Sequence, residues 1–483
     1  MSVLAKPENL DASIELLKGH FNGQILEPGD SAYDEARALW NGMIDKYPAV
    51  IAKCSGTDDV IQAISFAREA GLTIAVRGGG HNVAGLASAD GGIVIDLSEM
   101  NHVEVDPVHK RAKVQGGATI AMLDSETQKH GLATPMGVVS ATGVAGLTLG
   151  GGMGWLRRKY GLSCDNLLAA EVVTAEGKVV RASQSENPDL LWGLQGGGGN
   201  FGIVTGFEYQ LYDVGPEVAF TFVLYPLSEA KKVFRAHEAF LKQDTEGNVS
   251  TIALTGRIPH LDDIPQNLHG KPMCGIIGMF MGDAHEGVEA TRALREIAKP
   301  LLDFSGIMPY TEAQQMLDDD YPDGMRYYWK STSLMTLSDQ VLDILIDYSK
   351  TAPSDHSTID LWYHGGALAN KSEEETAYGR RDIPYLISPE ANWEELKDDE
   401  ANITWARNLL RDLKPYTEEN LYLNFPGFLE EGDSLMQSAF GKNYQKLVDL
   451  KTQYDPANLF KMNQNIKPKS YTEDLGSAEI LKA

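Results

Sequence analysis

Hydrophobic and polar positions near the start of the chain follow two periods, one typical of helices and one typical of strands. Apolar residues recur at helical spacing over residues 9–18 and 33–44, which predicts two helices that form a leading cap. Residues 49–52 predict a strand, and residues 57–71 predict a helix that threonine caps and glycine ends. A second strand is expected at residues 73–76, so the chain opens with a β-α-β unit.

The segments that follow predict a strand at residues 92–97 and a hairpin with arms at 102–106 and 111–115. A β-α-β opening followed by hairpins fits an α+β domain better than a regular parallel array. Farther along, long strands are separated by helices. The predicted strands are 217–227, 248–258, 273–281, 356–364 and 420–425, and the predicted helices are 229–243, 286–301 and 443–454. We expect the region 213–440 to form an antiparallel sheet backed by helices, a second domain.

Glycine is concentrated in one part of the chain. More than half of the 48 glycines fall between residues 71 and 206, in bursts at 78–80, 150–152 and 196–199. Glycine costs backbone entropy on folding, so this enrichment needs a reason. Glycine-rich loops between regular elements let backbone N–H groups approach an anion closely. The pattern therefore predicts a large phosphate-bearing cofactor rather than a flexible linker.

The formal net charge of −26 excludes some partners. An acidic surface repels nucleic acid and anionic membranes, so we expect neither as a partner. A solvated surface explains the acidity, and a salty habitat is the alternative. No apolar run approaches the ~20 residues that span a bilayer. The amino terminus lacks the pattern of a secretory signal, and three cysteines cannot form a disulfide framework, so we expect a cytoplasmic protein.

Short motifs exclude other chemistries. The spacing Gly197-x-Gly199-x-x-Gly202 matches the dinucleotide fingerprint, but that fingerprint needs a helix directly afterwards. Residues 203–209 are strand-like instead, which argues against an NAD site. There is no P-loop and no cysteine or histidine spacing typical of a metal site, so we expect no metal.

Two reactive residues stand out by their surroundings. His81 ends the burst at residues 78–80, and Cys164 lies in the segment Gly161-Leu-Ser-Cys-Asp-Asn166. From these residues alone, a hydrogen-bonding histidine and a small buried cysteine are the simpler interpretations. A chemical role for either residue stays open at this point.

Five longer segments carry a family resemblance. They are RGGGHNVAGL (77–86), GGIVIDLSEMNHVEVDP (91–107), GVAGLTLGGGMGWLRRKYGLSCDNLLAAEVVTAEG (143–177), LLWGLQGGGGNFGIVTGFEY (190–209) and NYQKLVDLKTQYDPANLFKMNQNIKP (443–468). Together they resemble the berberine-bridge-enzyme-like oxidases of the vanillyl-alcohol oxidase and p-cresol methylhydroxylase superfamily. The middle of the chain resembles this family only in its strand layout.

The resemblance implies a two-part FAD-binding domain, residues 1–212 continued by 441–483, around a substrate-binding domain at 213–440. It also implies FAD bonded twice, with His81 attached to the flavin 8α-methyl and Cys164 attached to C6. Imidazole and thiolate are nucleophiles that an oxidised flavin can accept. Further cofactor-binding residues follow from the same resemblance: Arg77, Gly78, Gly79, Gly80, Asn82, Gly85, Leu86, Gly137, Ser140, Gly143, Gly146, Gly150, Gly152, Trp155, Gly202, Val204 and Asn463.

The substrate face is expected on two strands of the second domain. Tyr422 and Asn424 alternate along the segment 420–425 and would share one side of a strand. The family carries a Tyr-x-Asn of this kind, so the resemblance implies that Tyr422 is the catalytic base. Trp362 and His364 share one face of the strand 356–364 with Asp360, and residues 327–329 form an aromatic cluster. Ordinary core packing is an alternative for all of these except Tyr422.

The function implied is that of an FAD-linked oxidase. It would remove a hydride from a secondary alcohol, hemiacetal or similar C–H of a sugar or natural product, and it would pass the electrons to molecular oxygen, giving hydrogen peroxide. A dehydrogenase of the same fold with another electron acceptor is the alternative, and a catalytically idle ligand-binding protein is a third hypothesis. The substrate and the oligomeric state are not predicted.

Overall fold

The first sheet assembles the β-α-β unit at the start of the chain. In the computed structural model, which describes residues 10–262, 264–418, 422–425 and 433–469, its strands are ordered β1-β2-β4-β3. β2 and β3 both pair in parallel with β4, and α3 connects them. α3 ends at Gly71, whose φ of 66° is left-handed. The bounds are α1 Leu10–Lys18, β1 Gln24–Leu26, α2 Tyr33–Arg37, β2 Val50–Lys53, α3 Thr57–Ala70, β3 Ile74–Arg77 and β4 Ile93–Asp96.

The second sheet is antiparallel, with the order β5-β6-β10-β8-β9. β10 directly follows the glycines at 196–202, which confirms the predicted strand there and rules out the helix that the dinucleotide fingerprint requires. The bounds are β5 Val103–Asp106, β6 Arg111–Gln115, α4 Ile120–Thr127, β7 Leu132–Ala133, α5 Val144–Leu149, α6 Arg157–Tyr160, β8 Leu167–Val173, β9 Val179–Ser183, α7 Pro188–Leu194, β10 Ile203–Gln210 and β11 Tyr212–Asp213, which pairs with β7.

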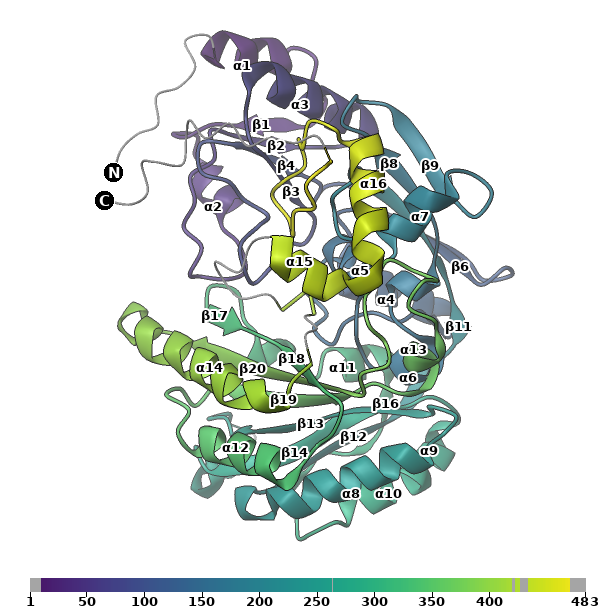
Figure 1. Cartoon of the computed structure of the whole chain (residues 1–483), viewed down its shortest axis with the longest axis vertical. Helices are drawn as coiled ribbons and strands as arrows, with labels where there is room; N and C mark the ends of the chain where they lie inside the picture. Colours follow the sequence, from purple (N-terminus) through teal and green to yellow (C-terminus); the bar gives the residue numbers. More distant parts are fainter. Residues whose placement is uncertain (1–9, 263, 419–421, 426–432, 470–483) are drawn as a thin grey trace.

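The third sheet is larger and lies below the first two in Figure 1. Its strands are ordered β15-β12-β14-β13-β19-β20-β17, with β16 added beside β12 and β18 beside β20. The strand bounds are β12 Glu217–Pro226, β13 Val249–Arg257, β14 Pro272–Phe280, β15 Leu302–Asp303, β16 Gly306–Pro309, β17 Arg326–Trp329, β18 Thr332–Leu334, β19 Thr358–Tyr363 and β20 Tyr385–Trp393. The helix bounds are α8 Ala230–Gln243, α9 Ala284–Ala290, α10 Arg292–Arg295, α11 Tyr310–Gln314, α12 Asp339–Lys350, α13 Gly366–Asn370 and α14 Asp399–Leu413.

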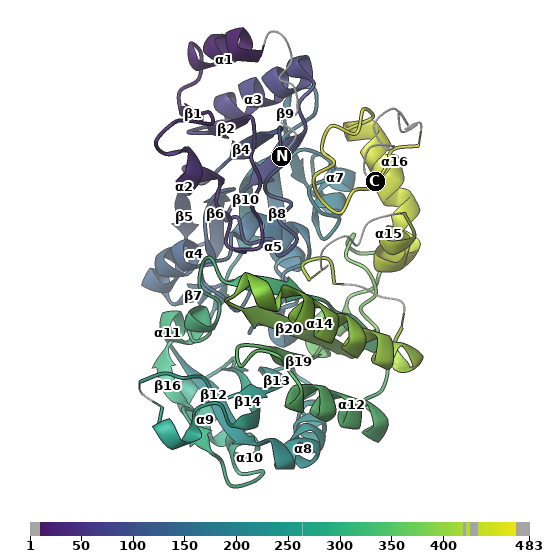
Figure 2. The same ribbon diagram turned by 90° about the vertical axis from the view of Figure 1, so that its left-hand side faces the viewer.

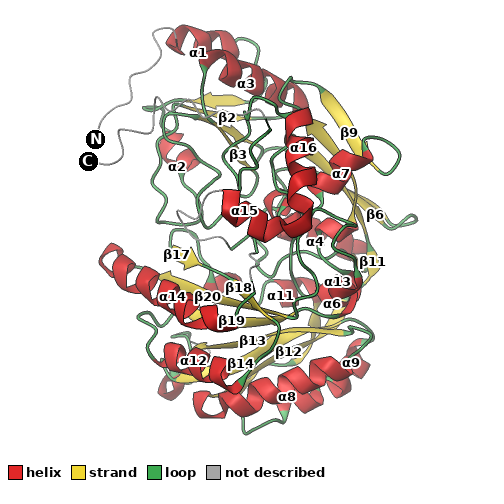
Figure 3. Cartoon of the chain, in the orientation of Figure 1, coloured by secondary structure: helices red, strands yellow, loops and turns green. Residues whose placement is uncertain are grey.

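The two faces of the third sheet bury different cores. Helices α8, α12 and α14 cover one face, and Ile359 and Leu361 of β19 belong to the core beneath them (Figure 3). Trp362 belongs to the core on the opposite face, together with Tyr422 and Cys164. Because side chains alternate along a strand, Asp360 shares the face of Trp362. That face is directed toward the first two sheets, so polar side chains on it can contact a molecule bound between the sheets.

The last helices return to the first half of the molecule. α15 Asp433–Phe440 and α16 Tyr444–Tyr454 lie beside α7 in Figure 2. The Lys451 ammonium is buried and binds the Asp455 carboxylate at 2.7 Å and the carbonyl oxygens of Asn200 and Phe460, each at 2.9 Å. The division at residues 212 and 440 stays a prediction, which the composition of the three sheets supports.

Three predicted elements are wrong in extent. The helix expected at 33–44 ends at Arg37, because Trp40 leaves the helical path to stack on a neighbouring ring. The helix expected at 286–301 breaks into α9 and α10 and ends at Arg295. Of the strand expected at 420–425, residues 420 and 421 lie outside the described residues, and residues 422–425 form a turn in which the Phe425 N–H donates to the Tyr422 carbonyl.

Lys451→Met tests how strongly the returning tail is held. The substitution leaves the Asp455 carboxylate buried without its cation, so we expect a loss of about 3–5 kcal/mol in the free energy of unfolding. Lys469→Met removes a half-exposed pair with Asp449 and should cost less than about 1 kcal/mol. Urea unfolding followed by tryptophan fluorescence measures both changes. Equal losses in the two variants would contradict a structural role for the buried pair.

Candidate active site

A deep cavity separates the glycine-rich loops from the third sheet. It encloses about 1740 Å³ of space free of atoms, its open mouth included. One end is lined by backbone of the glycine bursts and by residues of the returning tail. The other end is lined by aromatic and acidic side chains of the third sheet and its neighbours. The cavity thus joins a backbone surface suited to a phosphate-bearing group with a side-chain surface suited to a second, smaller molecule.

His81 lies at the wall of this cavity in the loop after β3. Its ring stacks on Trp40 with centroids 3.9 Å apart, and Trp40 stacks on Tyr327 at 3.7 Å. The Nε2 atom is buried and has no hydrogen-bond partner among the described residues. Burial lowers the pKa of His81 to about 4. The imidazole is therefore neutral at neutral pH, the form in which a ring nitrogen can act as a nucleophile.

The glycines at the cavity serve two different purposes. Gly79 and Gly143 touch each other, since a Cβ on either would lie 2.4 Å from the backbone nitrogen of the other. These two glycines are required by the packing of loop against loop. A Cβ on Gly146 of α5 would meet nothing within 4 Å, although Gly146 lines the cavity. Its missing side chain leaves room only for a molecule bound in the cavity.

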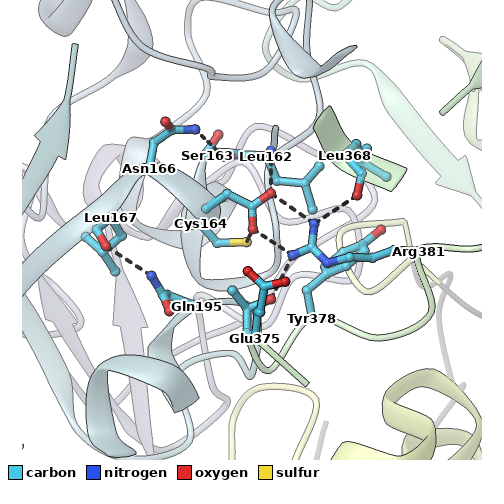
Figure 4. Close-up of polar contacts among 12 residues, drawn as sticks. Leu162, Ser163, Cys164, Asn166, Leu167, Gln195, Leu368, Glu375, Tyr378 and Arg381 are labelled. Carbon is cyan, nitrogen blue, oxygen red and sulfur yellow. Dashed lines mark hydrogen bonds and ion pairs between the residues drawn. The ribbon is translucent and has the colours of Figure 1, made fainter. Parts of the chain in front are cut away.

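Cys164 is buried next to an ion pair that joins the two halves of the chain (Figure 4). Its Sγ lies 3.9 Å from Asp165 Oδ1. The Arg381 guanidinium binds the two oxygens of Asp165 at 2.6 and 2.9 Å, and both charged side chains are almost fully buried. Burial raises the pKa of the Cys164 thiol well above its ordinary value, and Asp165 adds to the rise. The thiol is therefore protonated, and Cys164 is not among the residues that line the cavity.

Tyr422 and Asn424 meet at the cavity wall. The Tyr422 hydroxyl accepts hydrogen bonds from Asn424 Nδ2 at 3.0 Å and from the Met153 N–H at 3.2 Å. Asn424 Nδ2 also donates to the Leu147 carbonyl of α5 at 3.1 Å. Burial raises the pKa of Tyr422 to about 12, while the two donors act to lower it. The donors favour the phenolate and leave the hydroxyl proton free for another acceptor.

Most of the predicted cofactor-binding residues line the cavity. These are Gly78, Gly79, Gly80, Asn82, Leu86, Gly137, Gly143, Gly146, Gly150, Gly202, Val204 and Asn463. The wall also includes His81, Tyr422, Asn424 and Trp362. Their functions stay predictions, since position alone does not assign them.

Other predicted site residues lie outside the cavity wall. The side chain of Arg77 donates to the Ala36 carbonyl, and Ser140 donates to the Asp318 carboxylate through its backbone N–H and its hydroxyl. Trp155 packs edge-on against a phenylalanine. The remaining residues of this group are Gly85, Gly152, Cys164 and His364.

His364 is buried at the end of β19. Its Nδ1 lies 2.9 Å from the Ile383 carbonyl, and burial lowers its pKa to about 4. Ile383 lies in the loop before β20, and His364 does not line the cavity, so its place in substrate binding remains a prediction.

Two buried carboxyl groups at the cavity were not among the predicted site residues, although Asp360 was expected on the substrate-facing side of its strand. Asp360 and Glu390 both line its far end, beside Tyr321 and Trp329. Glu390 stands in β20, a strand that is buried along its whole length. No strand was predicted at residues 385–393, so the structure was needed to show that this glutamate is buried, which is rare for a charged residue without a function or a partner.

Comparison with known proteins places this cavity in context. A family model described as an FAD binding domain matches residues 48–183, and one described as berberine and berberine like matches residues 421–467. The FAD-linked oxidoreductase YvdP of Bacillus subtilis strain 168, itself uncharacterized, is 30% identical over 454 residues, which cover 92% of this chain and 98% of YvdP.

Solved structures show the same fold. The structure of 6-hydroxy-D-nicotine oxidase from Arthrobacter nicotinovorans matches with a TM-score of 0.81 and 28% identity, over 97% of this chain and 100% of that one. Glucooligosaccharide oxidase from Acremonium strictum matches with a TM-score of 0.82 and 23% identity, over 97% and 100%. At 23% identity, the likeness to glucooligosaccharide oxidase shows only that the two chains share a fold.

The fold and the FAD binding domain define the class of protein, since together they describe an FAD-linked oxidoreductase. The sequence identity of 30% to YvdP, over 98% of its length, extends the assignment from the class to the family. The chain belongs to the berberine-bridge-enzyme-like family of FAD-linked oxidases within the vanillyl-alcohol oxidase superfamily. Within the described part of the chain, every helix is too short or too polar to traverse a lipid bilayer.

Gly146→Ala tests whether the cofactor occupies the open space above α5. In the free protein the new methyl group meets no atom, and alanine is favoured over glycine in a helix by about 0.5–1 kcal/mol. We therefore expect an unchanged or slightly raised melting temperature of the flavin-free protein, together with a lower flavin content after expression. Absorbance of the purified protein measures the flavin content.

Gly56→Ala is the matched control, because its Cβ would also meet open space and its backbone is extended, outside the cavity. It should keep the full flavin content. A Gly146→Ala protein with as much flavin as the control would show that the cofactor does not pass over α5.

Proposed function

We propose that this enzyme holds FAD through two covalent bonds, from His81 to the 8α-methyl and from Cys164 to C6. The resemblance of both segments to the family motifs supports the pair. Glucooligosaccharide oxidase from Acremonium strictum carries a 6-S-cysteinyl, 8α-N1-histidyl FAD. The neutral His81 at the cavity wall fits such a bond directly. Cys164 does not line the cavity, so it fits such a bond if the thiol both reaches the cofactor and loses its proton when the cofactor is bound.

The same proposal assigns the two parts of the chain. Residues 1–212 and 441–483 would form the cofactor domain, and residues 213–440 would form the substrate domain. The cavity lies where these parts meet, with Asn463 of the tail beside the glycine loops and Trp362 at the other end. The Asn463 amide donates to the Gly199 carbonyl at 3.1 Å, so the tail is held to the loop whose backbone lines the cavity.

The reaction that we propose is oxidation of a C–H bond next to a hydroxyl group in a sugar or natural product. FAD supplies a hydride acceptor when it is bound. Removal of the hydride leaves a protonated carbonyl unless a base takes the hydroxyl proton. We assign this proton to the Tyr422 oxygen, and molecular oxygen is the proposed final electron acceptor.

The observation that carries this proposal is the pair of donors on the Tyr422 hydroxyl. Asn424 Nδ2 and the Met153 N–H both point to the oxygen. Two such donors stabilise a phenolate, but burial keeps the pKa at about 12 in the free protein. A role as the base therefore requires that binding of cofactor and substrate lower the pKa of Tyr422.

The two proposed covalent bonds to the flavin are tested on the purified protein. Acid precipitation should leave all of the flavin in the pellet, because covalent bonds survive unfolding. A peptide digest should yield one flavin that joins the peptides of His81 and Cys164 by mass. Cys164→Ala should retain the flavin through His81 alone, and His81→Ala should retain it through Cys164 alone. Release of free FAD from the wild-type protein would refute the proposal.

Tyr422→Phe tests the proton transfer. The variant should keep its bound flavin and should reduce it at least roughly 10²-fold more slowly under anaerobic conditions, the scale of a lost acid–base group. In the wild type the rate should rise with pH, because the phenolate is the active form and its fraction grows toward the pKa. The variant should lose this rise. Stopped-flow absorbance with an oxidisable sugar or alcohol measures both.

Tyr378→Phe is a suitable control, since Tyr378 lies edge-on beside Tyr422 with ring centroids 6.3 Å apart and does not line the cavity. A Tyr422→Phe protein that reduces its flavin at the wild-type rate would place the base elsewhere. Mixing the reduced wild type with oxygen or with a dye then distinguishes the oxidase from a dehydrogenase, because only the oxidase reoxidises rapidly in oxygen.

A further inference from the structure

The far end of the cavity holds two carboxyl groups on neighbouring strands. β19 and β20 are antiparallel, with Thr358 opposite Glu390 and Asp360 opposite Ser388. Asp360 and Glu390 are therefore diagonal neighbours on one face of the sheet. Their residues are only 5% and 3% exposed. Both line the cavity, on the face opposite the one that the helices cover.

These carboxyl groups have few partners of their own. Glu390 Oε2 accepts a hydrogen bond from the Tyr321 hydroxyl at 2.7 Å. Asp360 Oδ1 is buried without a hydrogen-bond partner among the described residues. The described residues that line the cavity include no lysine and no arginine. An unpaired carboxyl oxygen in a buried site is costly, so it indicates a place for a donor that comes from outside the chain.

A buried cation beside Trp362 already has partners of its own. The Arg157 guanidinium lies 5.0 Å from the centre of the Trp362 ring. Its nitrogen atoms donate to the carbonyl oxygens of Gly154 at 3.0 Å and Thr251 at 2.6 Å. Arg157 is not one of the residues that line the cavity. Arg157 therefore supplies no donor inside the cavity to these carboxyl groups.

Aromatic rings surround the same end of the cavity. Trp329 stands opposite Glu390 in the pairing of β17 with β20, and its ring meets Phe425 edge-on at 5.4 Å. Trp362 and Tyr321 line the cavity beside them. Ring faces attract cations, most strongly where water is excluded. Acidic oxygens within an aromatic enclosure form a site that suits a positively charged organic group rather than a neutral hydroxyl group.

We propose that this end of the cavity binds a protonated amine of the substrate, with its N–H groups directed to Asp360 and Glu390. The proposal rests on the proposed function, because it names the class of substrate whose C–H bond would face the flavin. The substrate is then an amine-bearing alcohol, held by its cation at one end and oxidised beside its hydroxyl group at the other.

Binding of such a cation should release a proton. Burial raises the pKa of Asp360 to about 7, and the nearby Asp320 carboxylate adds to the rise. Burial and the neighbouring Asp360 raise the pKa of Glu390 well above its ordinary value, while the hydrogen bond from Tyr321 lowers it. At neutral pH the pair therefore holds at least one proton. An ammonium group that binds to the carboxyl pair displaces this proton into the solvent. Because the proton competes with the cation, the affinity for a permanently charged cation should rise with pH.

The test uses the flavin-loaded protein and three probes of similar shape. These are benzylamine, benzyl alcohol and benzyltrimethylammonium, whose charge does not depend on pH. Anaerobic calorimetry in buffers of different ionisation enthalpy gives the affinity and the number of protons released. At pH 7 benzylamine should bind at least roughly 10-fold more tightly than benzyl alcohol and should release close to one proton. Benzyl alcohol should release none, and benzyltrimethylammonium should bind more tightly at pH 8 than at pH 6.

Glu390→Gln keeps the shape of the side chain and removes its charge. It should weaken benzylamine binding by roughly 10-fold or more, abolish the proton release and change benzyl alcohol binding less than about threefold. Asp360→Asn should do the same and serves as the second variant if the first does not fold. Asp124→Asn is the control: this carboxyl is also buried without a hydrogen-bond partner among the described residues, but it lies in α4 outside the cavity. The control should behave as the wild type.

The outcomes separate this proposal from the proposed reaction. Equal binding of amine and alcohol, no detectable binding of the amine, or proton release that persists in both variants would each overturn the amine site. A preference for the amine that disappears in Glu390→Gln supports it, whether or not Tyr422→Phe slows reduction of the flavin. A Tyr422→Phe protein that reduces its flavin at the wild-type rate, with an intact amine preference, would refute the proposed proton transfer alone.

Discussion

The geometry of this enzyme depends on a contact between two loops that only glycine permits. Gly79 and Gly143 approach so closely that a Cβ on either would lie 2.4 Å from the nitrogen of the other. This contact sets the loop after β3 against the start of α5. The Leu147 carbonyl of α5 then anchors the Asn424 amide, which in turn binds the Tyr422 hydroxyl. A backbone contact in the cofactor half thereby positions a side chain at the substrate end.

The parts of the fold with local causes could be predicted from the sequence. The helix that ends at Gly71 and the strand at 203–209 depend on residues next to them, and both were found. The helix expected at 33–44 failed because Trp40 is held by His81 and Tyr327, rings that are distant in the sequence. Residues 422–425 likewise form a turn whose side chains bind α5 rather than a strand. The periodicity of hydrophobic positions does not show contacts between residues that are distant in the sequence.

The candidate site divides in the same way. Its cofactor end consists of contiguous glycine-rich segments, so both the composition and the family resemblance pointed to it. Its far end is made by the register of two strands, which brings Asp360 beside Glu390 across 30 positions of sequence. Neither residue carries a motif, and only the pairing shows that two acids share one buried face. The distinct purposes of Gly79 and Gly146 also required coordinates, because the residue type is the same.

The tail that completes the cavity has a consequence for how the enzyme is made. Synthesis on the ribosome is vectorial, so the loop that carries His81 emerges long before Asn463, although both line one cavity. The nascent chain cannot enclose its cofactor until Asn463 has left the exit tunnel. Until then the glycine loops stand open to water, and one wall of the cavity is missing.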